Sequence, residues 1–516
     1  MELSEHIKTA NVEDVTLRRP FHPALRGTLC VTSHHLLFSN RKDEASWQLL
    51  ILLKNIDAIE KRAVGSSGTI TIKCKDLLVL QLEIPGMEEC LNIASSIEAL
   101  SSLESVTEMY PFFYRPSHLT LLGPWGLSTT EQYYKQTERL WDRWRVSKVN
   151  SDYSVCPSYP SAVIVPREVD DDKLIRSARF RQGGRFPVLS YCHHSNGMVI
   201  MRSSQPLTGA NKKRCKEDEL LLQAVIDGSE LGYIIDLRSA QQAQQARMTG
   251  GGFESKSCYR HWKRIHRHHE RGKVVQESLI KLVEACSDLS HSVDRWLSKL
   301  ENSKWLSHVH SALSTAGLVV ECVERDGHSV LVHGSEGTDN TLLVSSLAQI
   351  ILDPASRTVT GFLCLLEREW IQAGHPFQQR CAHSAYSHAR LKQECPSFLL
   401  LLDCVWQVWR QFPLALEFSE ALLLRLAQEV YASNYGTFLC NNEQERWCSL
   451  LEKPECAEQY LNPLYEPTDL AIWPSVHPQS LQLWTGMFLR WTEYAQNMEE
   501  AREEVWSIVK EHRERV

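Results

Sequence analysis

The chain has 516 residues, of which 43% are hydrophobic and 23% are charged, and its formal net charge is -7. This composition is that of an ordinary globular protein, and it excludes a chain that binds nucleic acid through its overall charge. At roughly 150 residues per domain, the length predicts two to four domains, or one large domain with a smaller one attached.

Sixteen cysteines are spread along the chain, and no two are closer than eight residues. This spacing lacks both zinc-binding pairs and a dense disulfide framework, so we expect a reducing compartment and no metal or other cofactor. The start, MELSEHIKTA, has no signal-peptide pattern, and the longest apolar stretch, FLLLLDCVWQVW, is interrupted by Asp403 and too short to span a bilayer. We therefore expect a cytoplasmic protein that is at most peripheral on endomembranes.

The first hundred residues are rich in predicted strands. Four runs are alternating or continuously apolar between turn-forming residues, as β-strands are. We expect them to form a small barrel or sandwich. The runs are at 27–39, 47–53, 68–74 and 77–84.

A single helix is predicted directly after these strands, within 85–102. Apolar residues recur there at helical spacing and would form one buried face. Strands closed by one C-terminal helix are typical of a pleckstrin-homology-like domain, which we assign to residues 1–108. The predicted apolar face consists of Met87, Leu91, Ala94, Ile97 and Leu100.

An aromatic segment, YPFFYRP at 110–116, follows this domain. We assign 109–122 to a linker and expect the aromatic side chains to plug the junction between two domains rather than to bind a ligand. Beyond it, helical patterns alternate with short apolar strands, which indicates an α/β domain whose sheet is covered on both faces. The clearest of these strands are GMVIM at 197–201, GYIID at 232–236 and SVLVH at 329–333.

The segment SVLVHGSEGTDNT, from Ser329 to Thr341, is typical of a buried strand, a polar loop with glycines, and a helix. Such a loop directs backbone amides toward one point, and the helix N-terminus adds partial positive charge there. The arrangement suits an anion such as phosphate. By itself the pattern does not separate an anion-binding loop from a structural turn.

The same segment resembles the active-site loop of the myotubularin phosphoinositide phosphatases, a cysteine-phosphatase family whose loop reads His-Cys-Ser-Asp-Gly-Trp-Asp-Arg-Thr. Gly334 stands where the family has its nucleophilic cysteine, and Asn340 stands where it has the phosphate-binding arginine. Glu336, Thr338 and, upstream, Ala246 also depart from the pattern of active members. The positions that agree are His333, Ser335, Gly337, Asp339 and Thr341.

The resemblance continues through most of the chain in the family's order and spacing. It implies that residues 1–108 form a PH-GRAM domain and that 123–496 form a cysteine-phosphatase-like α/β domain. The segments that carry it are RFPVLSY (185–191), SQPLTG (204–209), RCKEDE (214–219), GGGFE (250–254), ESLIKLVEAC (277–286), SLAQIILDPASRTVTGF (346–362) and EREWIQAGHPFQQRC (367–381).

The two departures in the loop remove the chemistry of a cysteine phosphatase. A thiolate must attack phosphorus, and glycine has no side chain, while a neutral amide cannot replace the charged fork of a guanidinium. Ser335 has no evident activating base in the loop. Asp339 matches the family's acid, but without a nucleophile we expect it to serve as a helix N-cap or loop hydrogen-bond partner. We predict a pseudophosphatase whose loop is a retained scaffold or a weak phosphoinositide-binding pocket.

The resemblance also implies a role. Inactive myotubularins are expected to bind active members and to raise their activity or stability toward phosphatidylinositol 3-phosphate and 3,5-bisphosphate. Such hetero-oligomers need a pairing surface, and homo-oligomers would use one too. The candidate is a heptad pattern of about two repeats at 497–516, although a plain terminal helix fits this short segment equally well. Its apolar positions are Met498, Ala501, Val505 and Ile508.

Two alternatives remain open, a phosphoinositide-binding membrane tether and a residual lipid phosphatase. NKKRCKED at 211–218 is expected to be a surface loop and helix start, and the histidine-rich HWKRIHRHHERG at 261–272 a solvated basic surface, because no companion ligands stand at metal-site spacing. A tether would need a strong basic cluster on the first domain. The sequence offers only a modest one there, Lys61, Arg62, Lys73 and Lys75.

Overall fold

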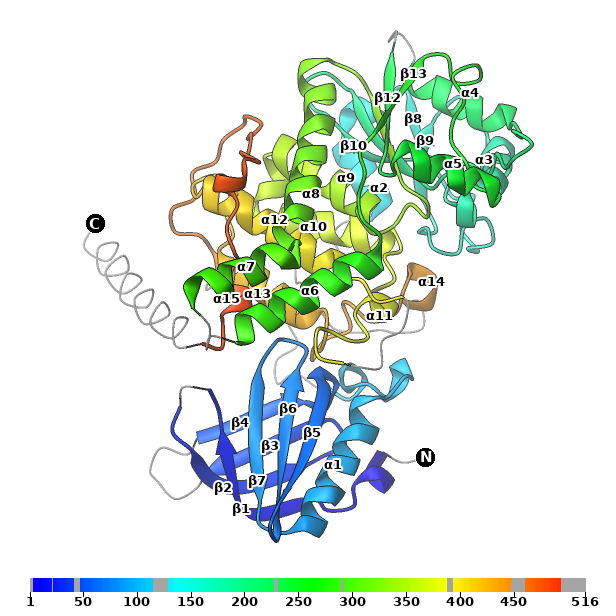
Figure 1. Cartoon of the computed structure of the whole chain (residues 1–516). Helices are drawn as coiled ribbons and strands as arrows, with labels where there is room; N and C mark the ends of the chain where they lie inside the picture. The colour runs from blue at the N-terminus through cyan, green and yellow to red at the C-terminus, as the bar shows by residue number, and fades with distance from the viewer. Residues whose placement is uncertain are drawn as a thin grey trace.

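The structure is a computed structural model in which a strand-rich N-terminal domain adjoins a larger domain of helices around a short sheet (Figure 1). The predicted architecture, a PH-like domain followed by an α/β domain, is confirmed. None of the helices described is long and apolar enough to cross a membrane. The residues that the structure describes are 3–20, 22–40, 47–114, 129–226, 231–288, 292–387, 393–446 and 460–492.

Seven antiparallel strands form the N-terminal sheet, in the order β4-β3-β2-β1-β7-β6-β5. Side chains alternate between core and surface, so that Leu80, Leu82 and Ile84 are all buried in the last strand. The strands are β1 (Asn11–Arg18), β2 (Leu25–Val31), β3 (His35–Asn40), β4 (Trp47–Leu52), β5 (Ile56–Val64), β6 (Ser67–Cys74) and β7 (Val79–Ile84).

Two details of the predicted strands were wrong. The run at 27–39 is not one strand, because the Thr32 hydroxyl accepts the amide of His35 at 2.9 Å and turns the chain between β2 and β3. Strands β1 and β5 were not among the predicted strands. Both carry several charged residues, which obscure the alternation that identifies a strand from sequence.

The closing helix α1 (Met87–Ser101) forms as predicted and packs on β5, β6 and β7. Ala94, Ile97 and Leu100 are buried in the core. Leu91, in contrast, is 53% exposed, while its neighbours Cys90 and Ile93 are buried. The buried face of α1 therefore includes Cys90 and Ile93 in place of Leu91. Because successive residues are 100° apart around a helix, this face is rotated from the predicted one.

Five strands form the sheet of the large domain, in the order β10-β11-β14-β12-β13. The last four run parallel to one another, and β10 is antiparallel. The three apolar strands identified in the sequence are its three central strands. The bounds are β10 (Val188–Cys192), β11 (Val199–Ser203), β12 (Gly232–Asp236), β13 (Trp262–His266) and β14 (Val330–His333), with a separate pair β8 (Trp144–Ser147) and β9 (Val163–Pro166).

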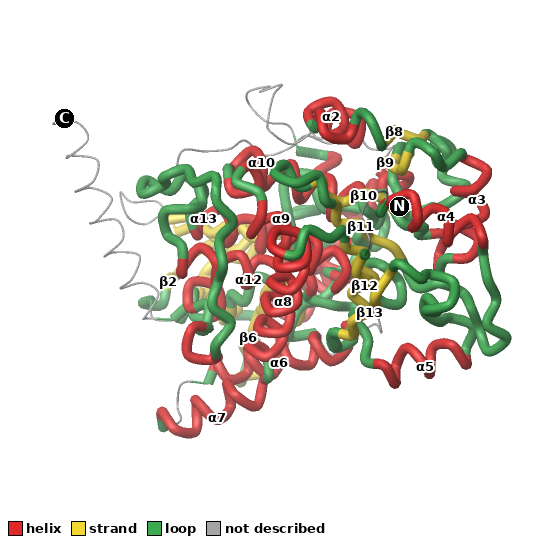
Figure 2. Tube along the Cα trace, turned by 90° about the horizontal axis from the view of Figure 1, so that it is seen from above, coloured by secondary structure: helices red, strands yellow, loops and turns green. Residues whose placement is uncertain are grey.

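Both faces of this sheet are covered, as the alternation in β14 shows. Val330 and Val332 belong to the main core with α6, α8, α9 and α12, whereas Leu331 belongs to a second core on the other face with residues of α4. In the view from above, α8 and α6 lie on one side of the strands and α3 and α4 lie on the other (Figure 2). These helices are α3 (Asp171–Phe180), α4 (Lys216–Val225), α6 (Gly272–Ser287), α8 (Trp305–Val320), α9 (Asn340–Leu352) and α12 (Ser397–Gln411).

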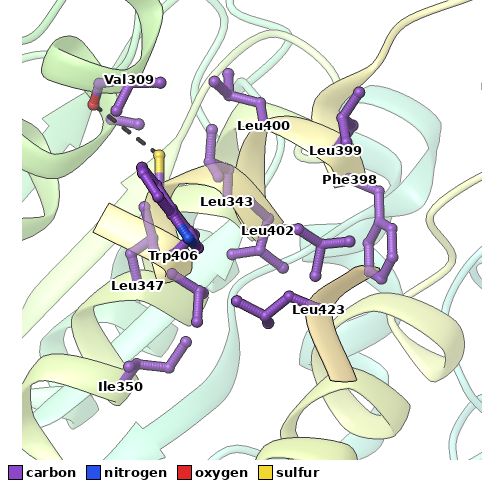
Figure 3. Packing of buried hydrophobic residues seen from close by; sticks show 14 of the residues in the cluster. Val309, Leu343, Leu347, Ile350, Phe398, Leu399, Leu400, Leu402, Trp406 and Leu423 are labelled. Atoms are coloured by element: carbon purple, nitrogen blue, oxygen red, sulfur yellow. Dashed lines mark hydrogen bonds between the residues drawn. The ribbon is translucent and has the colours of Figure 1, made fainter. Parts of the chain in front are cut away.

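Helix α9 is buried along almost its entire length. Its Leu343, Leu347 and Ile350 pack among side chains of α12 such as Leu402 and Trp406 (Figure 3). Asn340, the first residue of α9, is therefore held in a fixed position. The other helices are α2 (Thr130–Gln136), α5 (Ala240–Met248), α7 (Val293–Ser303), α10 (Val359–Leu366), α11 (Phe377–Arg380), α13 (Glu420–Glu429), α14 (Glu443–Arg446) and α15 (Thr485–Phe488).

The two domains are joined by polar and aromatic contacts. The Asp57 carboxylate, at the start of β5, accepts the backbone amides of Ser384, Tyr386 and Ser387 at 3.0, 2.9 and 3.1 Å. The predicted aromatic plug bridges them as well. Its Tyr110 ring packs on His35, with centroids 4.3 Å apart, and its Tyr114 ring packs on Tyr435 at 5.5 Å. Residues 115 and 116 of this segment lie outside the described residues.

Candidate functional site

The candidate site is the loop between β14 and α9. The central, fully buried strand β14 ends at His333, and α9 begins at Asn340, close to the predicted helix start. Within the described structure, the backbone amides of residues 335–338 donate no hydrogen bond to other protein groups. The loop therefore presents free N–H donors at the N-terminus of a buried helix, which is the arrangement expected of an anion-binding loop.

Gly337 fits the loop because no larger residue can. Its φ is 74°, and a Cβ at this position would lie 2.5 Å from the Ser203 carbonyl oxygen of β11. The buried Arg185 supports the loop. Its guanidinium donates to the Gly337 carbonyl at 2.8 Å and to the Ala373 carbonyl at 2.9 Å. The amide of Gln205 binds the Ser335 carbonyl at 3.1 Å. These contacts keep the loop in one conformation.

Gly334 has room for a side chain. A Cβ there would lie 3.7 Å from the Thr341 hydroxyl and 3.9 Å from Leu237 Cβ, which are ordinary van der Waals distances. The Thr341 hydroxyl is buried and has no hydrogen-bond partner in the described structure. A space and an unpaired hydroxyl thus remain where a nucleophile would stand.

Asn340 does not supply a charge to the loop. Its side-chain amide donates to the backbone carbonyl of Glu270 at 3.1 Å, so it ties α9 to the segment that follows β13. An amide at this place is neutral and cannot form the bidentate contact of a guanidinium with phosphate.

Asp339 opens α9 but does not cap it with its side chain. Its φ is 48°, and no capping hydrogen bond forms, which corrects the N-cap alternative. A loop hydrogen bond does form, because the carboxylate accepts the Thr338 hydroxyl at 3.4 Å, but its shorter contacts are with residues outside the loop. The carboxylate pairs with Arg380, at 3.0 Å from Nε and 2.9 Å from Nη2, and accepts the Ser397 hydroxyl at 3.1 Å. Burial by itself would raise the pKa of Asp339, but Arg380 and His375 outweigh it and hold this pKa below its ordinary value.

Arg380 is the site residue that sequence reasoning missed. It lies in EREWIQAGHPFQQRC, one of the segments of the resemblance, but the linear sequence holds no signal that places it beside the loop. Besides Asp339 it approaches the Glu336 carboxylate, at 3.5 Å. A cation thus stands beside the loop, but it is already paired with loop carboxylates.

A buried charged network supports the strand end. His333 Nε2 is 3.0 Å from the Glu254 carboxylate, which pairs with Arg181 at 2.7 Å, and Arg181 pairs in turn with Asp218 at 2.7 Å. Burial would raise the pKa of Glu254, but His333 and Arg181 hold it well below its usual range. Asp218 and Glu254 come from RCKEDE and GGGFE, so segments distant in the sequence converge beneath the loop.

The remaining loop residues offer no replacement chemistry. Ser335 and Glu336 are exposed, and the Ser335 hydroxyl has no hydrogen-bond partner in the part of the chain described. The Thr338 hydroxyl donates to Asp339 at 3.4 Å. Ala246 lies in α5, where its carbonyl receives the amides of Thr249 and Gly251. None of these contacts places a base beside the Ser335 hydroxyl.

The predicted basic set on the first domain is weaker than expected. Lys75 is only 2% exposed, and burial lowers its pKa to about 7. Lys61 pairs with Glu98 at 2.8 Å, and Lys73 pairs with Glu60 at 2.6 Å. Arg62 remains exposed. A lysine enclosed in protein contributes nothing to a membrane-facing surface, so the assignment of Lys75 to that set was wrong.

The other basic stretches differ from each other. Residues 211–214 are exposed and α4 begins at Lys216, so the predicted surface loop and helix start are confirmed. The stretch 261–272 is only partly a solvated surface, because it contains β13 and because His269 is buried against the Thr315 hydroxyl at 3.0 Å. The candidate pairing residues Met498, Ala501, Val505 and Ile508 lie outside the described residues.

Comparisons with known families agree with this geometry. Residues 109–447 match the myotubularin-like phosphatase domain, and residues 11–101 match the GRAM domain of the MTMR6-9 group. A PH-like GRAM domain therefore precedes a phosphatase-like domain of the cysteine-phosphatase kind. The chain belongs to the myotubularin family.

Three relatives illustrate its place there. Myotubularin-related protein 9-like of Bos taurus is 58% identical over 99% of this chain and 96% of its own length. Myotubularin-related protein 9 of Homo sapiens is 56% identical over 100% of this chain and 95% of its own. Phosphatidylinositol-3,5-bisphosphate 3-phosphatase MTMR6 of Homo sapiens is 34% identical over 94% of this chain and 80% of its own.

Proposed function

We propose that this protein is a catalytically inactive myotubularin that acts as an adapter or regulatory subunit of active family members. It binds those phosphatases and raises their activity or stability toward phosphatidylinositol 3-phosphate and 3,5-bisphosphate. It acts in the cytoplasm, peripherally on endomembranes. The proposal combines family membership with the composition of one loop.

The observation that carries the proposal is Gly334 at the end of the central strand. The loop has free amides and the supporting Arg185, but the glycine at position 334 has no side-chain atom that could attack phosphorus. Asn340 is turned to the Glu270 carbonyl, and Arg380 is paired with Asp339. A well-formed fold without a nucleophile favours a binding role over a catalytic one.

The relatives supply the class of partner. The name of the human MTMR6 relative states a phosphatidylinositol-3,5-bisphosphate 3-phosphatase, and that of an MTMR7 relative from Pongo abelii states a phosphatidylinositol-3-phosphate phosphatase. The latter is 33% identical over 98% of this chain. A chain of the same architecture can pair with such an enzyme. In this mixed assembly it occupies the place that a second copy of the enzyme would occupy.

Activity is tested first with the purified full chain. We expect no release of phosphate from either lipid above a no-enzyme blank, because the missing thiolate and guanidinium together remove far more than the roughly thousandfold due to one transition-state donor. Human MTMR6 serves as the positive control. Turnover that persists after repurification would contradict inactivity and favour the residual phosphatase.

Pairing is tested by co-precipitation of the full chain with MTMR6 and by the rate of MTMR6 in its presence. The variant Val505→Asp/Ile508→Asp places two charges in the predicted heptad seam, and we expect it to lose both binding and stimulation while staying soluble. Glu503→Gln, outside the predicted apolar positions, is the matched control. If the double variant binds like the parent, the pairing surface lies elsewhere on the protein.

A second candidate function, weak phosphoinositide binding by the loop, is favoured by its free amides at 335–338. The burial of Lys75 and the pairing of Lys61 and Lys73 weigh against a tether that depends on the first domain alone. Vesicle sedimentation with and without phosphatidylinositol 3-phosphate tests this candidate. Ser335→Glu, which adds a negative charge to the loop, should abolish such binding if it takes place there.

A further inference from the structure

A cavity of about 330 Å³ lies beside the first residue of α9, apart from the loop 334–339. Its walls come from α6, from the C-terminal end of α7 and the N-terminal half of α8, and from residues 268–270 after β13, with Leu400 of α12 also lining it. Asn340 is its only lining residue from the start of α9. This volume is at the lower end of the range for small-molecule sites.

Two helices present one face each to this cavity. Ser307, His308 and Ser311 of α8 are spaced by three and four residues and lie on a single helix face, and Lys304, whose φ is 61°, precedes the helix. Helix α7 ends where α8 begins, so the partial negative charge of the α7 C-terminus offsets the partial positive charge of the α8 N-terminus. The preference of the cavity for an anion therefore depends on its side chains.

The charged side chains of the lining favour an anion. Lys281 of α6 and Lys304 both line the cavity, and within the described part of the chain neither forms an ion pair. Glu270 is the one acidic residue among those lining it, and its carboxylate lies 3.2 Å from His268 Nε2. Two free ammonium groups thus face one carboxylate that already has a partner.

An unpartnered buried group adds an independent observation. His308 lines the cavity, is only 8% exposed, and its Nε2 has no hydrogen-bond partner in the described structure. A bound ligand could supply the hydrogen-bond partner that this atom lacks. Val274, Val275 and Leu400 complete the lining with an apolar surface.

We propose that this cavity binds a small phosphorylated molecule. The phosphate is held by Lys281 and Lys304 near the N-terminus of α8, and the carbon skeleton lies against Val274 and Leu400. A phosphate monoester carries close to two negative charges and several acceptor oxygens, so it matches two ammonium groups better than a single carboxylate does. The site is separate from the loop 334–339, and Asn340 connects the two through its bond to the Glu270 carbonyl.

Isothermal titration calorimetry of the full chain tests the proposal with inositol 1,3-bisphosphate, and vesicle sedimentation tests it with phosphatidylcholine containing phosphatidylinositol 3-phosphate. We expect Lys281→Ala/Lys304→Ala to weaken binding at least about tenfold. Lys273→Ala is the matched control, because Lys273 lies on the same helix but does not line the cavity. It should leave the affinity unchanged.

The outcomes distinguish a soluble ligand from a lipid headgroup, and binding in the cavity from binding at the loop 334–339. Binding to the free bisphosphate alone supports a soluble ligand, and binding to the vesicles alone supports a lipid headgroup, provided that the double variant is weakened in each case. Equal affinity of parent and double variant, no binding of either probe, or loss of binding in Ser335→Glu with retention in the double variant would overturn the proposal. Citrate binding as tightly as the bisphosphate would overturn the phosphate assignment.

Discussion

At residue scale, Gly334 has room for a side chain, and the unpaired Thr341 hydroxyl lies beside it. We predict that Gly334→Cys produces a cysteine with a pKa below the ordinary value of about 8.5, because the unpaired Thr341 hydroxyl and the N-terminus of α9 would both stabilise a thiolate. Peptide-resolved alkylation with iodoacetamide as a function of pH measures this. The native Cys395, whose pKa burial raises, is an internal reference.

The control for that experiment is Gly334→Cys/Thr341→Val, which keeps the space but removes the hydroxyl. Its alkylation midpoint should move to higher pH. Identical midpoints in the two variants would show that Thr341 does not act on position 334. We expect neither variant to hydrolyse phosphoinositides, since Asn340 still leaves the site without a phosphate-binding guanidinium.

The Asp339–Arg380 pair is a largely buried ion pair within the site. We predict that Asp339→Asn lowers the free energy of unfolding by about 2–4 kcal/mol at pH 7, because it leaves a largely buried guanidinium without its counter-charge. Since the pKa of Asp339 is held low in the folded protein, this stabilisation is present at neutral pH and is lost as the pH falls below about 4. Urea unfolding at several pH values measures it.

Glu336→Gln is the matched control for Asp339→Asn. Its side chain also approaches Arg380 but is 68% exposed, so the expected change is within about 0.5 kcal/mol. If the difference between Asp339→Asn and the parent did not shrink in acid, the pair would not be the source of the stability. The two variants together separate a buried ion pair from a solvated one.

At the scale of elements, the loop depends on close contact with the neighbouring strand β11. We predict that Gly337→Ala lowers the free energy of unfolding by about 3 kcal/mol or more, because a Cβ would meet the Ser203 carbonyl oxygen at 2.5 Å in addition to the strain of a positive φ. Gly327→Ala is the control. Its φ is 68°, but no atom lies within 4 Å of its Cβ, so only about 1 kcal/mol is expected.

The free energies of unfolding are measured by urea denaturation. If both glycine variants lose the same amount, β11 moves to accommodate the added methyl group at position 337. A larger loss at 337 would instead identify the loop as a rigid part of the domain. A rigid loop has a physical reason here, because it opens α9, which is buried along almost its whole length.

At the scale of the whole molecule, Asp57 connects the two domains. We predict that Asp57→Asn weakens their docking, so that the N-terminal domain unfolds at a lower temperature than the large domain in differential scanning calorimetry. An amide in place of the carboxylate cannot accept all three amides of Ser384, Tyr386 and Ser387 and turns a donor toward them. Glu83→Gln, an exposed change on β7, is the control.

Unchanged unfolding of Asp57→Asn would place the docking energy elsewhere, for example in the Tyr110 and Tyr114 contacts. The carboxylate is well placed for the role we assign to it. Burial would raise its pKa, but His383 and the backbone donors hold this pKa below the ordinary value, so Asp57 is charged at neutral pH. The segment it binds begins shortly after Arg380, which links the first domain to the site.

Much of the fold could be predicted because the apolar patterns are local. The strands at 197–201, 232–236 and 329–333 are continuous apolar runs between turn residues, and all three are central in the sheet. Strands β1 and β5 could not be predicted in this way, since charged side chains interrupt their alternation and only pairing with β2, β6 and β7 defines them. Leu91 was predicted to be buried but is exposed, so the helical pattern placed the buried face of α1 wrongly at this residue.

The sequence by itself determined the family, the order of the two domains and the glycine at position 334 with the asparagine at 340, because each follows from residue types and their spacing along the chain. The tertiary structure alone decided how the remaining charges are used. Arg380 and Asp339 are 41 residues apart yet form an ion pair, Lys75 is enclosed rather than exposed, and Lys281 and Lys304 face one cavity. Burial and pairing depend on what distant segments bring to the same place, and a linear pattern carries no information on that.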